Sequence, residues 1–289
     1  MNTCPWCNTP SQKTYLKVKD WFLSQETFEI MACEKCGLLF TVPRPGPDVI
    51  GGYYQSEAYY SHQNNKKGFI PRLYEWVKKP NLNYKVKLAL EKRTAGRVLD
   101  IGCGVGDFLA AVKQRGFGVV GVEPSTQARM VAKERLGFEP LDSNALDSLP
   151  DASFDVITMW HVLEHVDQLQ VEIQNLSRLL KADGTLIVAL PNFKSFDALF
   201  YQEYWAAWDV PRHLNHFSPD AIQFIFSETD FKLIDIQRLV WDAYYISYLS
   251  EKYKGHAVPL LRGLITGLRS NLKASRSGMY SSLVYRFHK

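Results

Sequence analysis

Four of the five cysteines in this chain stand in two pairs, each with two residues between its members. The first pair is Cys4 and Cys7, and the second is Cys33 and Cys36, which Gly37 follows at once. A C-x2-C turn offers two thiolates from one bend, and two such turns supply the four sulfur ligands of a structural zinc site. A redox pair and a chance arrangement are the alternatives. We predict Zn²⁺ that only holds a ribbon module together, because no further ligand is evident.

A glycine-rich loop of the form D-x-G-x-G-x-G runs from Asp100 to Gly106, after a β-branched segment and before a helical pattern. The dinucleotide fingerprint fails here because Asp107 stands where its last glycine belongs. Closely spaced glycines let the backbone approach a ligand, and Asp100 can hold a cationic ammonium group beside them. Glu123 ends the next β-branched segment, where a carboxylate can accept hydrogen bonds from both hydroxyls of a ribose. The two acids fit an adenosine that carries an amino acid better than a dinucleotide.

With these motifs, residues 97–190 resemble the class I S-adenosylmethionine (SAM)-dependent methyltransferases. The resemblance implies that the loop packs against the methionine part of SAM and that the acid after the second strand binds the ribose. It also implies that a polar segment after the third strand, at residues 142–146, contacts adenine. The plain alternative is a doubly wound domain whose glycines merely turn the chain. The residues implied to bind SAM in these segments are Asp100, Gly102, Gly104, Glu123, Asn144 and Leu146.

The letters H-x-x-E-H occur once, as His161, Glu164 and His165. This is the spacing of an inverted zinc-protease motif, which requires a helix, whereas the segment here directly follows a predicted buried strand. It resembles instead the F-D-x-I and L-E-H-V run of methyltransferases related to the ubiquinone-type O-methyltransferases, where the run borders SAM and the substrate. The resemblance implies that Trp160 and His161 flank the cofactor. Glu164 and His165 are then either structural or line the substrate or a bound cation.

A second histidine cluster, W-A-A-W-D-V-P-R-H-L-N-H-F-S at residues 205–218, follows the fifth predicted strand. Loops over a rigid sheet often carry specificity, and these side chains suit an aromatic or sugar-like acceptor. The segment resembles those of methyltransferases with an amino-terminal cysteine ribbon, so the resemblance extends over most of the chain. The alternative is a helix cap leading into Ser218, with Arg212 in a structural ion pair. A hydroxyl acceptor would need a base, and the candidates in order of preference are His213, His165 and His216.

These residues need a scaffold, and β-branched runs alternate with helical patterns from residue 97 onward. The alternation predicts an α/β, Rossmann-like, doubly wound fold with a mostly parallel seven-stranded sheet. We divide the chain into a zinc ribbon at 1–45, a helical connector at 46–96 that breaks at Pro80, and a methyltransferase domain at 97–289. Strands are predicted at 97–101, 119–122, 156–159, 185–190, 232–239 and 281–287, helices at 107–115, 126–136, 169–180 and 219–229, and an aromatic and basic insertion between the last two strands.

Composition and charge limit the function classes. A chain of 289 residues with 46% hydrophobic and 22% charged residues can bury a core, which excludes a disordered or collagen-like protein. The longest apolar run, 258–268, is interrupted by Arg262 and is shorter than the roughly 20 residues of a bilayer span. No signal peptide is recognisable, so we expect a cytoplasmic protein. Residues 251–289 hold eight Lys and Arg against one acid, which leaves the rest of the chain slightly acidic.

These observations predict a SAM-dependent methyltransferase that works mainly by positioning its reactants and by matching the charge lost at sulfur. The expected acceptor is a small-molecule, sugar or lipid-linked compound, methylated at oxygen. An RNA methyltransferase using the ribbon and the basic C-terminal segment is one alternative, although the ribbon itself is neutral. A non-catalytic SAM-binding scaffold is the other. The basic C-terminal segment also suits internal packing or a peripheral contact with an anionic membrane.

Overall fold

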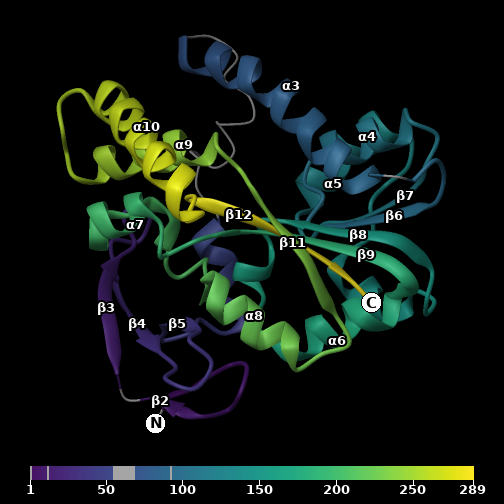
Figure 1. Ribbon diagram of the computed structural model, residues 1–289, viewed down its shortest axis with the longest axis horizontal. Helices are drawn as coiled ribbons and strands as arrows, with labels where there is room; N and C mark the ends of the chain where they lie inside the picture. The colour runs from purple at the N-terminus through teal and green to yellow at the C-terminus, as the bar shows by residue number, and fades with distance from the viewer. Residues whose placement is uncertain (1, 12, 55–68, 92) are drawn as a thin grey trace.

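The computed structural model describes residues 2–11, 13–54, 69–91 and 93–289. A central sheet carries helices on both faces, and the amino-terminal segment forms a smaller sheet beside it (Figure 1). This arrangement confirms the predicted α/β, Rossmann-like fold. The α-helices of the described residues are α1 (Pro47–Ile50), α3 (Phe69–Leu90), α4 (Asp107–Lys113), α5 (Thr126–Leu136), α6 (Leu169–Leu179), α7 (Phe196–Tyr201), α8 (Pro219–Ser227), α9 (Asp242–Tyr253) and α10 (Pro259–Ser277). The 3₁₀ helices are η1 (Gly51–Tyr54), η2 (Ser143–Ser148), η3 (Leu163–His165), η4 (Gln202–Tyr204) and η5 (Ala206–Trp208).

The strands of the central sheet lie in the order β11-β12-β9-β8-β6-β7. The neighbours from β9 to β7 are parallel, and β12 is antiparallel to both β9 and β11. Parallel strands end at the same edge, so the loops after β6, β7, β8 and β9 gather on one side of the sheet. The strands are β6 (Arg97–Ile101), β7 (Gly118–Val122), β8 (Phe154–Trp160), β9 (Leu180–Pro191), β11 (Lys232–Arg238) and β12 (Ser282–His288).

The sheet differs from the predicted one in strand number, because within the described residues it has six strands and not seven. Beyond β7 the chain pairs only through Leu141, as a single parallel bridge to Val122. Pro140 has no N–H with which to extend the pairing, and Asp142 caps η2 immediately afterwards. The seventh strand is therefore reduced to one residue.

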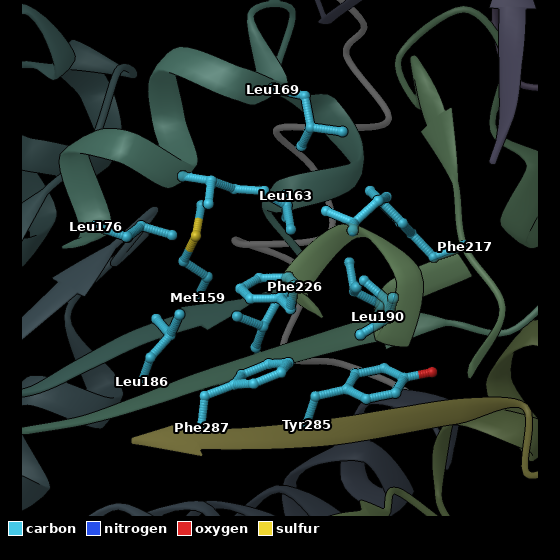
Figure 2. Packing of buried hydrophobic residues seen from close by; sticks show 14 of the residues in the cluster. Met159, Leu163, Leu169, Leu176, Leu186, Leu190, Phe217, Phe226, Tyr285 and Phe287 are labelled. Carbon is cyan, nitrogen blue, oxygen red and sulfur yellow. The ribbon is translucent and has the colours of Figure 1, made fainter. Parts of the chain in front are cut away.

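Side chains alternate across the sheet and divide the core into two layers. On β9, Leu186 belongs to the layer under α6 and α8, whereas Ile187 belongs to the layer under α3, α4 and α5. Figure 2 shows the first layer, in which Phe226 of α8 stacks on Phe287 of β12 with ring centroids 4.1 Å apart. The two layers hold the sheet rigid beneath the loops at its edge.

The connector helix α3 continues through Pro80, where the sequence predicted a break. A proline removes one helical hydrogen bond and bends the helix, but it does not have to end it when the following turns are packed. Those turns are packed here, since Val86 and Leu90 lie buried in the core layer shared with α4.

The insertion predicted between the last two strands folds as α9 and α10. Gly263 lets α10 lie close against α9, because a Cβ there would stand 2.6 Å from the Cα of Tyr248. Figure 1 shows the two helices side by side at the outer end of β12. Across the described ranges, none of the helices is both long enough and apolar enough to cross a bilayer.

The amino-terminal sheet is completed by a strand from far along the chain. Its order is β10-β5-β4-β3, and Asn215 of β10 pairs with Phe40 of β5. Arg212 adds a buried ion pair to Asp20, with Nη2 and Oδ1 2.9 Å apart. The predicted ribbon is thus bonded into the rest of the fold, and the domain boundaries at residues 45 and 96 stay predictions. The strands are β3 (Thr14–Lys19), β4 (Thr27–Ala32), β5 (Leu39–Val42) and β10 (Asn215–His216), beside the hairpin β1 (Asn2–Thr3) and β2 (Pro10–Ser11).

Candidate active site

The glycine loop joins the end of β6 to the start of α4. Gly102 has φ +70° and Gly104 φ +54°, a region of backbone conformation that favours glycine. A Cβ on Gly102 would lie only 2.4 Å from a methyl carbon of Val162, whereas one on Gly104 would meet nothing within 4 Å. Gly102 is thus required for packing against the next loop, while Gly104 leaves open space over the backbone.

Glu123 lies just beyond β7 and is bonded to this loop. Its Oε2 accepts a hydrogen bond from the backbone N–H of Gly104 at 2.9 Å, and its Oε1 accepts one from Ser125 at 2.9 Å. Each carboxylate oxygen keeps a second lone pair, which two adjacent hydroxyls can use. The structure therefore brings together two of the predicted SAM-binding positions, and their role in binding stays a prediction.

Asp100 is almost fully buried at the end of β6, and its Oδ1 accepts a hydrogen bond from the Thr158 hydroxyl at 2.6 Å. Burial raises the pKa of Asp100 to about 7, although the Thr158 hydrogen bond and the positive charge of Lys85 oppose the rise. The Lys85 ammonium lies 4.7 Å from the centre of the Trp160 ring. No local pattern pointed to Lys85, because it comes from the connector helix α3.

The predicted adenine segment is the short helix η2. Asp142 caps it by accepting a hydrogen bond from the backbone N–H of Asn144 at 3.2 Å, and Asp142 also pairs with Arg129. The Asn144 side chain is exposed. Leu146 is buried in the core layer with α6. Of the two candidates, Asn144 is the one with an accessible side chain.

His161 follows Trp160 and has φ +59°. This conformation is unfavourable for a residue with a β-carbon, so the surrounding contacts must stabilise it. Its Nε2 lies 2.9 Å from Asp242 of α9, and its Nδ1 lies 3.3 Å from Glu164. Burial disfavours the charged ring, but the two carboxylates outweigh it and raise the pKa of His161 to about 9. Asp242 lies 81 residues further along the chain, so no spacing pattern could have pointed to it.

The three candidate bases meet although they come from two loops. The ring centroids of His165 and His213 are 4.6 Å apart, and those of His213 and His216 are 6.4 Å apart. Burial and the neighbouring His213 lower the pKa of His165 to about 4. His216 is buried and hydrogen-bonded through Nε2 to the Thr41 hydroxyl at 2.9 Å. Burial, with the same neighbour, holds the pKa of His216 well below its ordinary value.

The contacts of Arg212 and Ser218 fit the alternative of an ion pair and a helix cap. Arg212 is 3% exposed and its guanidinium bonds Asp20 and Asp209. Ser218 caps α8 by accepting a hydrogen bond from Ala221. His213 differs from both, because it stays partly exposed and its Nδ1 lies 2.9 Å from the carbonyl oxygen of Ala207.

Two groups of described residues could hold a metal ion. The first is the predicted set of four cysteines, none of which is in a disulfide. Its sulfur atoms lie 3.5 Å apart for Cys4 and Cys36, and 3.4 Å apart for Cys7 and Cys33. Sulfur ligands at about 2.3 Å around a tetrahedral zinc ion lie roughly 3.8 Å apart, so the cluster fits that metal. The second group is Glu164, His165 and His213.

Residues 75–236 match the sequence model of the methyltransferase domain family. The chain belongs to this family. This methyltransferase is 27% identical over 170 residues to a ubiquinone biosynthesis O-methyltransferase of Rickettsia typhi, a match that covers 55% of this chain and 69% of the relative. It is 31% identical over 152 residues to an enzyme of the same name from Brucella ovis, covering 48% of this chain and 61% of the relative. The matches therefore span between 61% and 69% of the lengths of these relatives.

Solved structures place the fold of the methyltransferase in class I. A SAM-dependent methyltransferase from Archaeoglobus fulgidus aligns with a TM-score of 0.50 at 20% identity, covering 81% of this chain and 100% of that chain. The family match makes the chain a methyltransferase, and this likeness adds the fold of the class I SAM-dependent enzymes. The family match leaves out residues 1–74, which include the four paired cysteines, and everything after residue 236.

Proposed function

We propose that this methyltransferase moves the methyl group of SAM to a hydroxyl oxygen of a small-molecule acceptor. The observation that carries the proposal is the contact of Glu123 with Gly104, which unites an acid and a backbone loop at one edge of the sheet. The O-methyltransferase names of the relatives support oxygen as the methylated atom. Nothing in the comparisons supports a nucleic-acid acceptor.

Bound SAM supplies an electrophilic methyl group on a sulfonium ion. In the proposed complex, Glu123 holds the ribose hydroxyls and the glycine loop lies along the methionine part. Asp100 offers a carboxylate to the ammonium group. Asn144 and Leu146 belong to the adenine side in this proposal, and Trp160 and His161 border the cofactor.

The acceptor hydroxyl has to lose its proton, and we assign the position facing it to His213. Its Nδ1 is engaged with a main-chain carbonyl, so Nε2, which lies 3.9 Å from Oδ2 of Asp209, is the atom left for the acceptor. His165 has a pKa near 4, which makes it a weak base at neutral pH. His216 is buried against Thr41 and serves the contact between β10 and β5.

Calorimetry with SAM tests the cofactor part of the proposal. Glu123→Ala removes two acceptors of charge-assisted hydrogen bonds, which together contribute about 3 kcal/mol or more, so SAM affinity should fall at least about a hundredfold. The matched control is Glu134→Ala, an exposed acid on α5. Unchanged SAM affinity in the Glu123 variant would overturn the assignment.

Transfer of radiolabelled methyl tests the acceptor part. A panel of phenols, sugars and polyprenylated phenols should accept the label, and the matched amines and deoxy compounds should not. Labelling of bulk RNA instead would favour the RNA alternative. SAM binding without transfer to any acceptor class would favour the non-catalytic scaffold.

The four cysteines are the basis of a second proposal, a structural Zn²⁺ site in the amino-terminal sheet. The separations of their sulfur atoms and the absence of a disulfide among them support it. Purified protein should hold zinc at the stoichiometry of this site, and Cys33→Ser should lose it. Cys103→Ser, which changes the cysteine outside the cluster, is the control and should retain the metal.

We propose the outer face of α10, in the basic C-terminal segment, as the surface for the predicted membrane contact. Its apolar residues are between 39% and 60% exposed, and the helix carries four basic residues and no acid. An anionic lipid surface complements both features. A second copy would bring a like-charged helix, and nucleic acid would leave the leucines in water. The apolar residues are Leu261, Leu264, Ile265, Leu268 and Leu272.

Vesicle co-sedimentation tests this contact. The protein should bind phosphatidylglycerol vesicles more tightly than phosphatidylcholine vesicles, and the double variant Leu264→Glu/Leu268→Glu should weaken binding about tenfold or more. Val171→Glu changes an exposed residue on α6 and is the control. Equal binding by both variants would overturn the contact, and a change of oligomeric state in the double variant would point to a second copy as the occupant.

A further inference from the structure

Two stretches of the acceptor side are bonded to each other. One is the loop after β8, and the other is the β10 segment, residues 212–216. The backbone N–H of Leu214 donates to the carbonyl oxygen of Glu164 at 2.8 Å. The side-chain amide of Asn215 donates to the carbonyl oxygen of Val166 at 2.6 Å. The distance between the two stretches therefore depends on contacts with their main chains.

One arginine from the amino-terminal segment contacts both stretches. Arg44 donates from Nε to Oδ1 of Asp167 at 3.2 Å and from Nη2 to the carbonyl oxygen of the same residue at 3.0 Å. On the other side, Nη1 lies 3.3 Å from both the carbonyl oxygen of Leu214 and Oδ1 of Asn215. A planar guanidinium has five N–H donors, so it can bond two separate chain segments at once. Only 21% of the Arg44 side chain is exposed, because it is held between them.

The cysteine segment fixes the position of Arg44. The second cysteine turn leads into β5, and the backbone N–H of Cys33 donates to the carbonyl oxygen of Leu38 at 2.9 Å. The backbone N–H of Thr41 in β5 donates to the carbonyl oxygen of Leu214 at 3.0 Å. A strand that is hydrogen-bonded to neighbours on both sides, as β5 is to β4 and β10, opens less readily than a free loop. Arg44 comes two residues after β5 and so has a defined place beside β10.

We propose that Arg44 is a positioning residue of the acceptor side and that the amino-terminal cysteine segment acts through it. His165 lies on the loop after β8, and His213 lies on the β10 segment next to Leu214. By bonding both stretches, Arg44 sets how far apart these two imidazoles stand. Arg44 lies outside residues 75–236, which match the family. The cysteine segment thus determines the shape of the acceptor side in addition to its own fold.

The consequence for the reaction rests on the proposed function. Methyl transfer requires the acceptor oxygen and the methyl carbon to be aligned, and a misplacement of about 1 Å can cost about a hundredfold in rate. Loss of Arg44 should therefore weaken the use of the acceptor. Glu123 bonds Gly104 at a different part of the sheet edge, between the loops after β6 and β7, so SAM affinity should stay the same.

Amide hydrogen exchange, followed residue by residue by NMR on the full-length, zinc-loaded protein, tests how the two stretches are held. Exchange reports local opening, so Arg44→Ala should speed exchange of the Leu214 amide at least about tenfold. The Gly104 amide, which donates to Glu123, should change less than about twofold. Arg44→Lys keeps the charge but loses the planar fork, so the Leu214 amide should still exchange at least about threefold faster than in the wild type.

Arg93→Ala is the matched control. The Arg93 side chain is also 21% exposed, and its Nη2 donates to the carbonyl oxygen of Asp183 at 2.7 Å. Its Nη1 lies 3.9 Å from Asp155 at the start of β8, which is the opposite edge of the sheet. Exchange of the Leu214 amide in this variant should stay within about twofold of the wild type, because distant sites act independently.

Transfer of labelled methyl to the phenols of the panel supplies the functional readout. At saturating SAM, Arg44→Ala should raise the KM for the phenol at least about tenfold, whereas SAM affinity by calorimetry should stay within about twofold. A structural role alone would lower the free energy of unfolding without changing this KM.

Each result decides one of the two proposals. The role of Arg44 is overturned by equal Leu214 exchange in the wild type and Arg44→Ala, by wild-type exchange in Arg44→Lys, or by equal acceleration at Gly104 and Leu214. An unchanged phenol KM in Arg44→Ala overturns it as well. If the Leu214 amide exchanges faster in Arg44→Ala but the wild type methylates no member of the panel, the proposed function fails and the positioning of the two stretches by Arg44 stands.

Discussion

The proposed SAM side and the proposed acceptor side of the sheet edge are built in different ways. On the SAM side, the loop from Asp100 to Gly106 and the acid Glu123 come from one short stretch, and backbone N–H groups make the contacts. On the acceptor side, side chains converge from the amino-terminal sheet, the loop after β8 and the loop after β9. A common cofactor can be held by a local backbone motif, whereas a particular acceptor needs side chains that only long-range folding assembles.

The largest expected effect tests whether the two sides are independent. Arg212→Ala leaves the buried Asp20 carboxylate without its partner, and breaking such a pair costs about 3–5 kcal/mol. Denaturant unfolding should show this loss, and acceptor methylation should fall with it. SAM affinity at 25 °C should change less than about threefold if the protein stays folded. A parallel loss of SAM affinity would show that the comparison is wrong.

Smaller losses of stability are expected from substitutions in the glycine loop, and they should differ between Gly102 and Gly104. Gly102→Ala forces a Cβ into Val162 at a positive φ, which should cost about 3 kcal/mol of folding free energy. Gly104→Ala has only the backbone cost, about 1 kcal/mol, but its methyl group points into open space where SAM is proposed to lie. Urea unfolding should therefore show the larger loss of stability for Gly102→Ala. Calorimetry should show the larger specific loss of SAM affinity for Gly104→Ala. The same ranking by both methods would contradict the arrangement.

Asp100 gives a pH test confined to the SAM side. Its pKa in the folded protein, about 7, is raised above the ordinary value by burial. The neutral form therefore contributes stability that is complete below about pH 4 and is lost as the pH rises through 7. An ammonium group prefers the ionised form, so SAM affinity should rise about tenfold between pH 6 and 8. Asp100→Asn should show neither trend, and a pH dependence that persists in this variant would have another source.

The smallest expected loss of stability is at the contact between Thr41 of β5 and the two histidines His213 and His216. Thr41→Val removes hydrogen bonds to the His213 carbonyl and to the His216 ring, and should cost about 1–2 kcal/mol. Acceptor KM should rise while SAM affinity stays constant. A KM unchanged in this variant, with stability lowered as expected, would mean that this contact supports the fold alone.

Local sequence patterns were sufficient for the parallel strands and for the position of the glycine loop. The predicted strand 97–101 and helix 126–136 match β6 and α5 residue for residue. Both are regular elements with period-specific patterns and clear ends, such as Ser125, which caps α5. The reduction of the seventh strand to one bridge and the continuity of α3 could not be predicted from local patterns. A proline such as Pro140 or Pro80 can either end a regular element or be accommodated in it, and the surrounding packing decides which.

The candidate site divides along the same line. Gly102, Gly104 and Glu123 could be found because their spacing reflects contacts between consecutive elements. Lys85 and Asp242, which approach Trp160 and His161, could not be found. They lie on helices α3 and α9, whose sequence patterns predict a helix but not the distant residues that it contacts.

The sequence by itself determined the α/β class, the glycine loop and the two C-x2-C pairs, because each depends on residues that are neighbours in the chain. Only the tertiary structure decided that β10 completes the amino-terminal sheet and that His165 and His213 meet beside the buried carboxylate of Glu164. The physical reason is the range of the contacts. A turn or a glycine loop is selected by local backbone energetics, whereas a charge 81 residues away, such as Asp242 beside His161, is brought into place by the packing of the whole core.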